Sequence, residues 1–358
     1  MISTDTNLKR VAEKLAEGER LDLQDGIDCL STPDLFGLGR LAHAEKLRRY
    51  GRKVTYVFNR QINPTNICVL TCAFCDFAAR PNSPKGYEMS LEEILAACRG
   101  AREVHIVGGL HPNWKYDYYI EMIRRIRESY PEVQIKAWTA VEVDFFARLA
   151  KKNVQEVLFD LKEAGLDAMP GGGAEVLSER VKKALFPTKI GAARWLEIHR
   201  LAHEMGIHSN ATLLYGHIET VEEVVDHMLK LRQVQDQTGG FMSFIPLSLQ
   251  HGGTGLADRP THAGLDLRVT ATSRLLLDNF PHIKAYWVML GVPTATVALN
   301  FGADDIDGTI GKETIAHMAG ADSPIRLLCA QLEDMIKDAG MQPVERDALY
   351  NDVEAAVA

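Results

Sequence analysis

Residues 54–75 read VTYVFNRQINPTNICVLTCAFC, a predicted strand followed by a loop that holds three cysteines. The opening segment, VTYVFNRQI, is rich in β-branched and aromatic residues and alternates enough to indicate a β-strand. Cys68, Cys72 and Cys75 then follow within eight residues, although the whole chain has only six cysteines. Half of the thiols therefore lie in one loop, directly after one strand.

Strands and helices alternate along the rest of the chain. Helices are expected at 90–101, 116–130, 143–152, 155–165, 194–206 and 267–280. Further strands are expected at 103–109, 133–140, 166–170, 207–216, 240–247, 283–290 and 301–305. The first of these helices opens with a capping box, in which Ser90 is followed three residues later by Glu93. Seven or eight strands, each followed by a helix, imply a parallel sheet with right-handed crossovers.

Eight such units close into a barrel, whereas six would leave the sheet open. The pattern therefore predicts an α/β protein with a (β/α)8 TIM-type barrel. Residues 1–52 are expected to form an N-terminal helical extension packed on the barrel, and residues 53–358 the barrel with its C-terminal helices. Chemistry in such a fold belongs at the C-terminal ends of the strands. The cysteine loop falls on that face because it follows the first strand.

The composition limits the classes of function. The chain has 358 residues, of which 46% are hydrophobic and 25% charged, and its net charge is −8. An acidic chain is a poor general surface for nucleic acid or anionic membranes. The N-terminus lacks the apolar segment of a secretory signal, and no stretch approaches the roughly 20 apolar residues of a transmembrane helix. We therefore expect a cytoplasmic protein without a nucleic-acid or membrane partner, whose clustered thiols bind metal or act in catalysis.

Three interpretations of the cysteine loop are possible. A structural zinc site usually needs four ligands, but the other three cysteines are isolated and supply no second pair. A thioredoxin-like pair would use Cys72 and Cys75 and leave Cys68 unexplained. A 4Fe-4S cluster held by three thiolates would leave one iron open for a small molecule. In this third interpretation the absence of a fourth thiol leaves one iron able to bind that small molecule.

The spacing C-x3-C-x2-C, with the aromatic Phe74 before the last cysteine, resembles the signature of the radical S-adenosylmethionine (radical SAM) superfamily. The resemblance implies a barrel of the radical SAM kind and a 4Fe-4S cluster on Cys68, Cys72 and Cys75. It also implies S-adenosyl-L-methionine on the open iron, cleaved to methionine and a 5′-deoxyadenosyl radical. The protein would orient these groups and exclude water, while the cofactor carries the difficult chemistry.

Further segments match this superfamily in position. Gly108 and Gly109 end the second strand, where glycines receive the methionyl amino group; the alternative is a plain turn. Glu175, after three glycines, is expected to contact the ribose hydroxyls or to be a first-turn acid of the next helix. Glu142 follows the third strand and is expected to be either a cofactor contact or an acid at a helix start.

Polar residues near the end of the fifth strand complete the expected cofactor site. Asn210, Tyr215 and His217 could contact adenine or the substrate, and an ordinary loop histidine is the alternative for His217. Asp76, directly after the last cysteine, is where a small or neutral residue would be expected. A carboxylate there would oppose reduction of a cluster, unless it points to solvent.

The C-terminal third holds candidate proton and substrate contacts. Asp304 and Asp305, with Asp307, surround the expected last strand and indicate proton or substrate handling, unless they only form turns. His317 is a further catalytic candidate. Arg274 lies in a largely apolar helix and would need an anion if buried, but an arginine on the helix surface is the simpler assumption.

Longer strings extend the resemblance over residues 40–351. NPTNICVLTCAFC, AGLDAMPGGGAE, SNATLLYGHIET and NFGADDIDGT resemble the aminofutalosine synthase family of the futalosine route to menaquinone. This implies a transferase that adds the 5′-deoxyadenosyl radical to 3-[(1-carboxyvinyl)oxy]benzoate. Rearrangement and loss of a carboxylate as carbon dioxide or bicarbonate would then give aminodeoxyfutalosine. S-adenosylmethionine would be consumed as a cosubstrate.

The implied substrate carries two carboxylates, which need cations inside an acidic protein. Arg274 and Arg346 are the candidates, and Lys284 is the poorest because it lies near the start of its strand. The implied electron donor is a protein such as flavodoxin or ferredoxin. Two alternatives remain: a cyclase of the dehypoxanthine futalosine type, which releases free 5′-deoxyadenosine, and a non-catalytic iron–sulfur or zinc protein.

Overall fold

The fold was analysed in a computed structural model that describes residues 5–256 and 261–353. The outer ends of the two predicted domains, residues 1–4 and 354–358, lie outside the described residues. Ten strands form one sheet in the order β10-β1-β9-β8-β7-β6-β5-β4-β3-β2, and every named strand pair is parallel. Their bounds are β1 Lys53–Tyr56, β2 Asn59–Ile62, β3 Glu103–Ile106, β4 Gln134–Ala137, β5 Ala168–Met169, β6 His208–Tyr215, β7 Phe241–Ser248, β8 His282–Ala285, β9 Asp305–Ile306 and β10 Gln342–Glu345.

The sheet curls until its two ends meet. Only Val57 and Phe58 separate β1 from β2, so the run 53–62 belongs to both ends of the strand order. The Gln61 N–H donates to the Ile310 carbonyl at 2.8 Å, and the Thr309 N–H donates to the Val57 carbonyl at 3.2 Å. These bonds join the segment after β9 to the first strand. The predicted α/β barrel is therefore confirmed, with β10 added beside β1.

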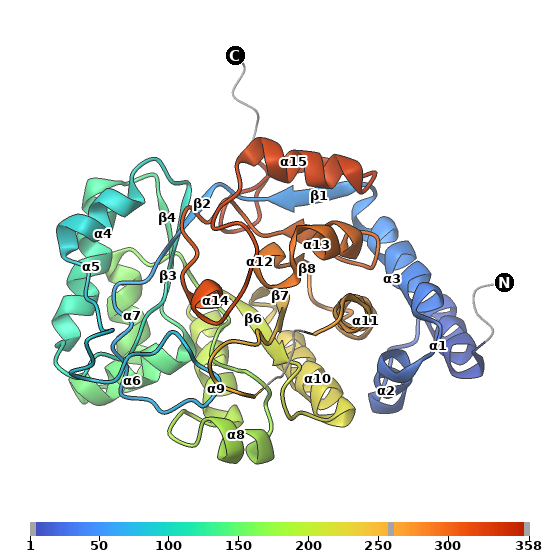
Figure 1. The fold of residues 1–358 in the computed structure, drawn as a ribbon, viewed down its shortest axis with the longest axis horizontal. Coiled ribbons are helices and arrows are strands. Elements are labelled where there is room, and N and C mark those ends of the chain that lie inside the picture. Colours follow the sequence, from blue (N-terminus) through green and yellow to red (C-terminus); the bar gives the residue numbers. More distant parts are fainter. Residues whose placement is uncertain (1–4, 257–260, 354–358) are drawn as a thin grey trace.

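Helices surround the sheet, as Figure 1 shows. Before the cysteine loop lie α1 Thr6–Glu17, α2 Leu23–Ser31 and α3 Leu35–Tyr50. Between β2 and β7 lie α4 Leu91–Cys98, α5 Tyr116–Ser129, α6 Ala140–Ala150, α7 Val154–Ala164, α8 Glu179–Leu185, α9 Ala192–Glu204 and α10 Val221–Thr238. The remainder are α11 Ala263–Leu276, α12 Trp287–Leu290, α13 Val292–Ala298, α14 Ile315–Met318 and α15 Cys329–Asp338.

Local sequence explains several of these boundaries. The Ser90 hydroxyl accepts the Glu93 N–H at 3.2 Å, and the Glu93 carboxylate accepts the Ser90 N–H at 2.7 Å. This confirms the predicted capping box of α4. Helix α7 ends at Gly165, whose φ of 112° is a conformation that glycine adopts without a steric penalty.

The N-terminal helices lie against the barrel's outer layer. Helix α3 packs on α11, and α2 packs on α10 and α11. A Cβ at Gly26 would come within 2.5 Å of the Val225 side chain, so α2 approaches α10 closely. The division into domains at residue 52 stays a prediction.

In the C-terminal half, one expected strand was wrong, the expected strand 301–305 overlaps β9 only at Asp305, and one strand was missed. The run 283–290 was expected as one strand, but β8 ends at Ala285 and α12 begins at Trp287. A short apolar run does not distinguish a buried strand from a buried helix. Strand β10 was not predicted, although it pairs with β1 along its whole length.

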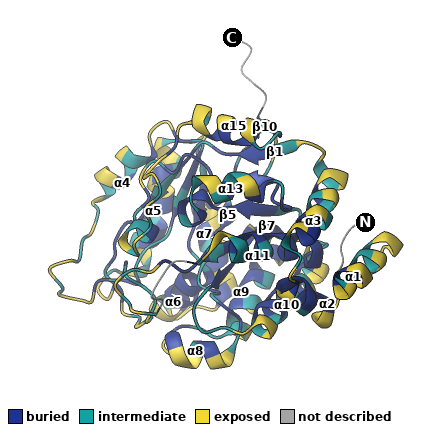
Figure 2. Cartoon of the chain, turned by 45° about the vertical axis from the view of Figure 1, so that its right-hand side comes forward, coloured by how far each residue is buried: buried dark blue, intermediate teal, exposed yellow. Residues whose placement is uncertain are grey.

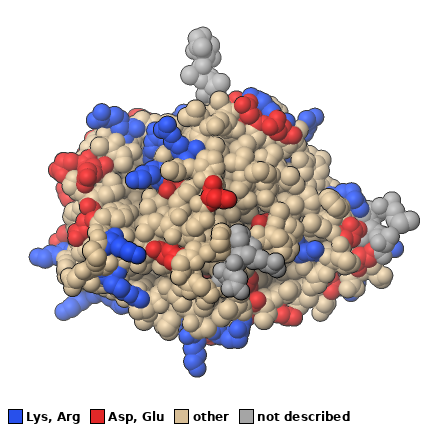
Figure 3. All heavy atoms as spheres, viewed as in Figure 1, with Lys and Arg blue, Asp and Glu red and all other residues tan. Residues whose placement is uncertain are grey.

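Burial follows the layers of the fold. Figure 2 shows β5 and β7 mostly in the colour of buried residues, while α1, α8 and α15 contain exposed residues. On the face in Figure 3, Lys and Arg are interspersed with Asp and Glu, mostly toward the edge. Within the described residues, no helix is both long and apolar enough to cross a membrane.

Candidate active site

A pocket of about 330 Å³ opens at the C-terminal ends of the barrel strands. Its lining includes the cysteine loop after β2, the segments after β3, β4 and β5, strands β6 and β7, and the segments after β8 and β9. Ile315 of α14 also lines it, and Figure 1 shows α14 in front of the sheet. The pocket therefore lies on the face where the strand pattern predicted chemistry.

The cysteine loop is held by hydrogen bonds to three other segments. The Cys68 N–H donates to the Ala79 carbonyl at 2.9 Å, and the Val69 N–H donates to the Leu110 carbonyl at 3.0 Å. The Ala73 N–H donates to the Leu185 carbonyl at 2.7 Å. The backbone thus fixes the loop before and between its cysteines.

All three predicted cluster ligands, Cys68, Cys72 and Cys75, border the pocket. In the part of the chain that the structure describes, no three His, Cys, Asp or Glu side chains converge on a single-ion site. The other three cysteines do not line the pocket, so a four-cysteine zinc site has no support here. Three thiols around one cavity, with no fourth thiol beside them, fit a cluster with one open iron.

The thiols lie among aromatic rings and a few charged groups, namely Lys189, its partner Glu175, and Asp76. The rings of Phe74 and Phe186 meet edge to face at 6.0 Å, and Lys189 Nζ lies 5.0 Å from the centre of the Phe74 ring. Burial raises the pKa of Cys72 to about 11, while Lys189 acts in the opposite direction. Such a cation would stabilise thiolates and a cluster of net negative charge.

The predicted glycines bring the β3 loop against the cysteine loop. A Cβ at Gly109 would lie 2.2 Å from the Ile67 carbonyl oxygen, so only glycine fits. Gly108 lines the pocket, and its N–H donates to Glu142 Oε1 at 3.0 Å. Glu142 also forms the capping box of α6 with Thr139, so it is both a helix-start acid and a pocket residue. Burial raises the pKa of the Glu142 carboxyl to about 7.

The triple-glycine segment after β5 packs against β6 as tightly as Gly109 packs against the cysteine loop. A Cβ at Gly171 would lie 2.4 Å from the Asn210 carbonyl oxygen. Glu175 has a φ of 49°, lies before α8 rather than in its first turn, and lines the pocket. The helix-dipole explanation of this acid is therefore wrong. Its carboxylate pairs with Lys189 Nζ at 2.5 Å.

Of the three candidates near the end of β6, only Asn210 lines the pocket. Its Oδ1 has no hydrogen-bond partner in the described residues. The Tyr215 hydroxyl instead donates to Asp266 at 2.7 Å, away from the lining. His217 Nε2 lies 3.0 Å from the Leu214 carbonyl, and Nδ1 lies 2.8 Å from Glu219. Its side chain is buried outside the lining, as for a structural loop histidine.

The C-terminal acids also differ in whether they line the pocket. Asp307 lines the pocket, whereas Asp304 and Asp305 do not. His317 lies one step away from the lining: its Nδ1 is 2.7 Å from Glu313 Oε2, and Glu313 borders the pocket. Asp76 does border the pocket, and burial raises its pKa.

The two predicted substrate arginines are fully buried, but the structure places both outside the pocket. Arg274 pairs with Asp304 between α11 and the sheet, so a side chain supplies its expected anion. Arg346 makes two bonds to Asp305, Nε–Oδ1 at 2.9 Å and Nη2–Oδ2 at 3.0 Å. Because each guanidinium is already paired with a carboxylate of the chain, neither arginine is proposed as a substrate contact.

Two lysines take the place of these arginines in the lining. Lys136 of β4 and Lys284 of β8 both border the pocket from inside the barrel. Lys136 Nζ is 2.6 Å from Glu103 Oε1, and Lys284 Nζ is 3.1 Å from Asp307 and 3.4 Å from Asp305. We call the charged base the set Glu103, Lys136, Lys284, Asp305, Asp307 and Arg346. Lys136 was missed, although a lysine inside an otherwise apolar strand is a signal that was available.

The chain is similar to known proteins over nearly its whole length. A family model described as the radical SAM superfamily matches residues 62–231, and one described as the CofH/MqnC C-terminal region matches residues 238–357. The chain is 47% identical to the aminodeoxyfutalosine synthase of Thermus thermophilus, covering 98% of this chain and 96% of that protein. It is 40% identical to a 5-amino-6-(D-ribitylamino)uracil–L-tyrosine 4-hydroxyphenyl transferase of Methanopyrus kandleri, covering 96% and 95%.

Two further matches bear on the alternatives and on the fold. The cyclic dehypoxanthine futalosine synthase of Streptomyces coelicolor is 36% identical, covering 96% of this chain and 88% of that protein. The crystal structure of methylornithine synthase superposes with a TM-score of 0.74 at 18% identity, covering 93% of this chain and 97% of that one. That last likeness concerns the fold alone.

Proposed function

The chain belongs to the radical SAM superfamily, in the family that includes the aminodeoxyfutalosine synthase of Thermus thermophilus, and we propose that it is an aminodeoxyfutalosine synthase of menaquinone biosynthesis. The observation that carries this proposal is 47% identity over nearly the whole of both chains. The proposed reaction joins the adenosyl group of S-adenosylmethionine to 3-[(1-carboxyvinyl)oxy]benzoate, with loss of one carboxylate.

The superfamily uses a 4Fe-4S cluster and S-adenosylmethionine, and three thiols at one end of the pocket fit the cluster. When bound, the cluster supplies the electron that cleaves the sulfonium bond of S-adenosylmethionine. Cys68, Cys72 and Cys75 would hold it, with Lys189 as the nearby cation. The chain's own task is to orient both substrates and to keep water away.

The other pocket residues divide between the two substrates in this proposal. Gly108, Glu142 and Glu175 lie near the cysteine end and would receive the polar groups of S-adenosylmethionine. Phe74 and Asn210 are proposed neighbours of the same cofactor. The catalytic roles expected for Asp304, Asp305, His217 and His317 would then be indirect, because none of these side chains lines the pocket.

A reductant is needed for each turnover, and we propose a small cytoplasmic electron-transfer protein of the flavodoxin or ferredoxin type. Its support is the chemistry alone, since the cluster must receive one electron before S-adenosylmethionine is cleaved. The same chemistry supports a reducing compartment.

A panel of substrates tests the proposal. The cluster-loaded enzyme is reduced without oxygen and given S-adenosylmethionine with one of three partners. These are the aryl enol ether, dehypoxanthine futalosine, or tyrosine with 5-amino-6-(D-ribitylamino)uracil. Only the first should yield a product that contains the adenosyl group.

The panel also separates the alternatives. Turnover of dehypoxanthine futalosine would support the cyclase, and transfer from tyrosine would support the 4-hydroxyphenyl transferase, whose relative is 40% identical. A verified cluster with no cleavage of S-adenosylmethionine by any pair would support a non-catalytic iron–sulfur protein.

A further inference from the structure

The base of the pocket holds cations that neither the cysteine loop nor its supporting glycines use. Lys136 and Lys284 come from β4 and β8, and both face the cavity from strand interiors. Only 3% and 1% of their surfaces are exposed, so solvent does little to screen their charges. A buried ammonium is costly unless it is paired, and these two are paired only in part.

Hydrogen-bonding capacity remains on both ammonium groups. An ammonium has three N–H donors. The described residues supply one carboxylate to Lys136, from Glu103, and two to Lys284, from Asp305 and Asp307. Two donors on Lys136 and one on Lys284 are therefore free to meet a ligand in the cavity.

A histidine beside Lys136 also lacks a partner. His105 of β3 is directly opposite Lys136 in the strand register, lines the pocket, and has a buried Nε2 without a hydrogen bond in the described residues. Burial lowers its pKa to about 4, so the imidazole is neutral at physiological pH. In the tautomer that carries hydrogen on Nε2, it offers one more neutral donor to an anion.

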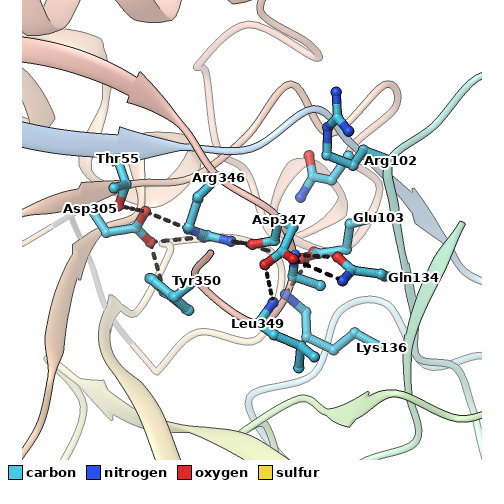
Figure 4. A network of polar contacts seen from close by, with 12 residues as sticks. Thr55, Arg102, Glu103, Gln134, Lys136, Asp305, Arg346, Asp347, Leu349 and Tyr350 are labelled. Atoms are coloured by element: carbon cyan, nitrogen blue, oxygen red, sulfur yellow. Dashed lines mark hydrogen bonds and ion pairs between the residues drawn. The ribbon is translucent and has the colours of Figure 1, made fainter. Parts of the chain in front are cut away.

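The charged base is arranged around these lysines by the C-terminal segment. Arg346 follows β10 and lies between Asp305 and Glu103, as Figure 4 shows. Asp305 also accepts the Thr55 hydroxyl at 2.7 Å and the Tyr350 hydroxyl at 2.8 Å. Asp305 is thus held mainly by groups outside the pocket lining, and its distance of 3.4 Å to Lys284 Nζ is the longer of that lysine's two carboxylate contacts.

The local electrostatics favour an anion beside Lys136. Burial alone would raise the pKa of Glu103, but Lys136, Arg346 and Lys284 together hold it at about 2. The charged base as a whole balances three carboxylates against three cations, and all three cations act on Glu103. Burial lowers the pKa of Lys136, and the neighbouring Lys284 and Arg346 act in the same direction, although Glu103 opposes them. An additional negative group beside Lys136 would stabilise its charged form. Burial also opposes the charge of Lys284, but Asp307 and Asp305 outweigh burial and raise the pKa of that lysine.

We propose that Lys136 and Lys284 bind the two carboxylates of the substrate, one each, at the base of the pocket. This inference rests on the proposed function, because it takes the aryl enol ether dicarboxylate as the ligand. Glu103 and Asp305 are positioning residues that hold the two ammonium groups from below. The substrate would then lie between the charged base and the cysteine end of the cavity.

Equilibrium binding to the cluster-loaded, unreduced enzyme tests the proposal without turnover. Calorimetry compares wild type with Lys136→Met and Lys284→Met, using 3-[(1-carboxyvinyl)oxy]benzoate as the probe. The dissociation constant should rise at least about thirtyfold in each variant, as expected for loss of a buried ion pair. Binding of S-adenosylmethionine should stay within about twofold of wild type.

Controls separate binding from folding. Lys9→Met removes an exposed lysine of α1 and should bind the dicarboxylate as wild type does. The paired variants Glu103→Gln/Lys136→Met and Asp307→Asn/Lys284→Met remove both charges of a pair, so no carboxylate is left unpaired. They replace the single variants if thermal unfolding shows that those are unstable, and the same loss of affinity is expected.

Analogues with one carboxylate assign each lysine. One analogue, 3-(vinyloxy)benzoate, lacks the carboxyvinyl carboxylate, and the other, (1-carboxyvinyl)oxybenzene, lacks the benzoate carboxylate. Each lysine variant should bind one of them within about threefold of wild type, because that analogue lacks the group the lysine would meet.

The outcomes keep the two proposals apart. Folded lysine variants that bind the dicarboxylate within about threefold of wild type would overturn the lysine assignment, while wild-type synthesis of aminodeoxyfutalosine would leave the function standing. A wild type that neither binds nor converts the dicarboxylate would overturn the function and this inference with it.

Discussion

The two ends of one pocket are built in opposite ways. The cysteine end is local: Cys68, Cys72 and Cys75 lie within eight residues, and neighbouring loops hold their backbone. The charged base draws its six residues from β3, β4, β8, β9 and the segments beyond β9 and β10. The comparison shows that the expected cluster ligands lie close together in the sequence. The residues proposed to bind the substrate are far apart in the sequence, and only the folded barrel brings them together.

Replacing a cysteine ligand should have the largest effect on this comparison. In Cys72→Ala, the cluster loses one of three protein ligands, so cluster absorbance and turnover should both disappear. Cys329→Ala is the matched control, because that thiol lies on α15 outside the pocket, and it should keep both. Absorbance spectroscopy after anaerobic reconstitution makes the measurement. An active Cys72→Ala enzyme without a cluster would remove the basis of the account.

Breaking the charged base should destabilise the fold and leave the cysteine end intact. Arg346→Met leaves Asp305 buried without its main ion pair, which should lower the free energy of unfolding by about 3–5 kcal/mol. The same change at Arg200, whose pairing with Glu204 is exposed, should cost less than about 1 kcal/mol.

Chemical denaturation compares these two variants, and Asp305→Asn/Arg346→Met should recover most of the loss. Equal stability of the two single variants would show that the charged base does not support the fold.

The pH dependence of stability tests Glu142, a buried acid that lines the pocket near the cysteine loop. Burial raises the pKa of Glu142 from 4.5 to about 7, so the folded protein holds this proton more tightly than the unfolded chain does. Stability from this group should therefore fall as pH rises from 4.5 to about 7 and then level off, by roughly 2–3 kcal/mol in total.

Glu142→Gln should flatten that part of the pH profile, as measured by denaturant unfolding at several pH values. An unchanged slope in the variant would assign the proton to another group.

The same contrast explains how far sequence reasoning reached. The alternation of elements and the α4 capping box depend on short-range patterns and could be predicted. The pairing of β10 with β1 joins residues that are far apart in the sequence, such as Lys53 and Gln342, and no local pattern marks it. Arg274 shows the limit most clearly, since its apolar helix left burial open and gave no sign that Asp304 would be its partner.

The lysines of the charged base were missed or ranked last for a related reason. Lys284 lies near the start of the predicted strand 283–290, where chemistry is not expected, but β8 is His282–Ala285, so Lys284 is next to its C-terminal end. The shorter strand therefore places Lys284 in the pocket lining. Strand alternation gives the inward direction of such a residue, but only the closed sheet shows what it meets.

The fate of the adenosyl group tests the central proposal most directly. S-adenosylmethionine carrying ¹³C in its ribose is given, with the aryl enol ether, to the reduced, cluster-loaded enzyme, and the products are weighed by mass spectrometry. The account predicts that the label appears in aminodeoxyfutalosine, with one adenosyl group retained in each product molecule. Label found only in free 5′-deoxyadenosine would contradict it.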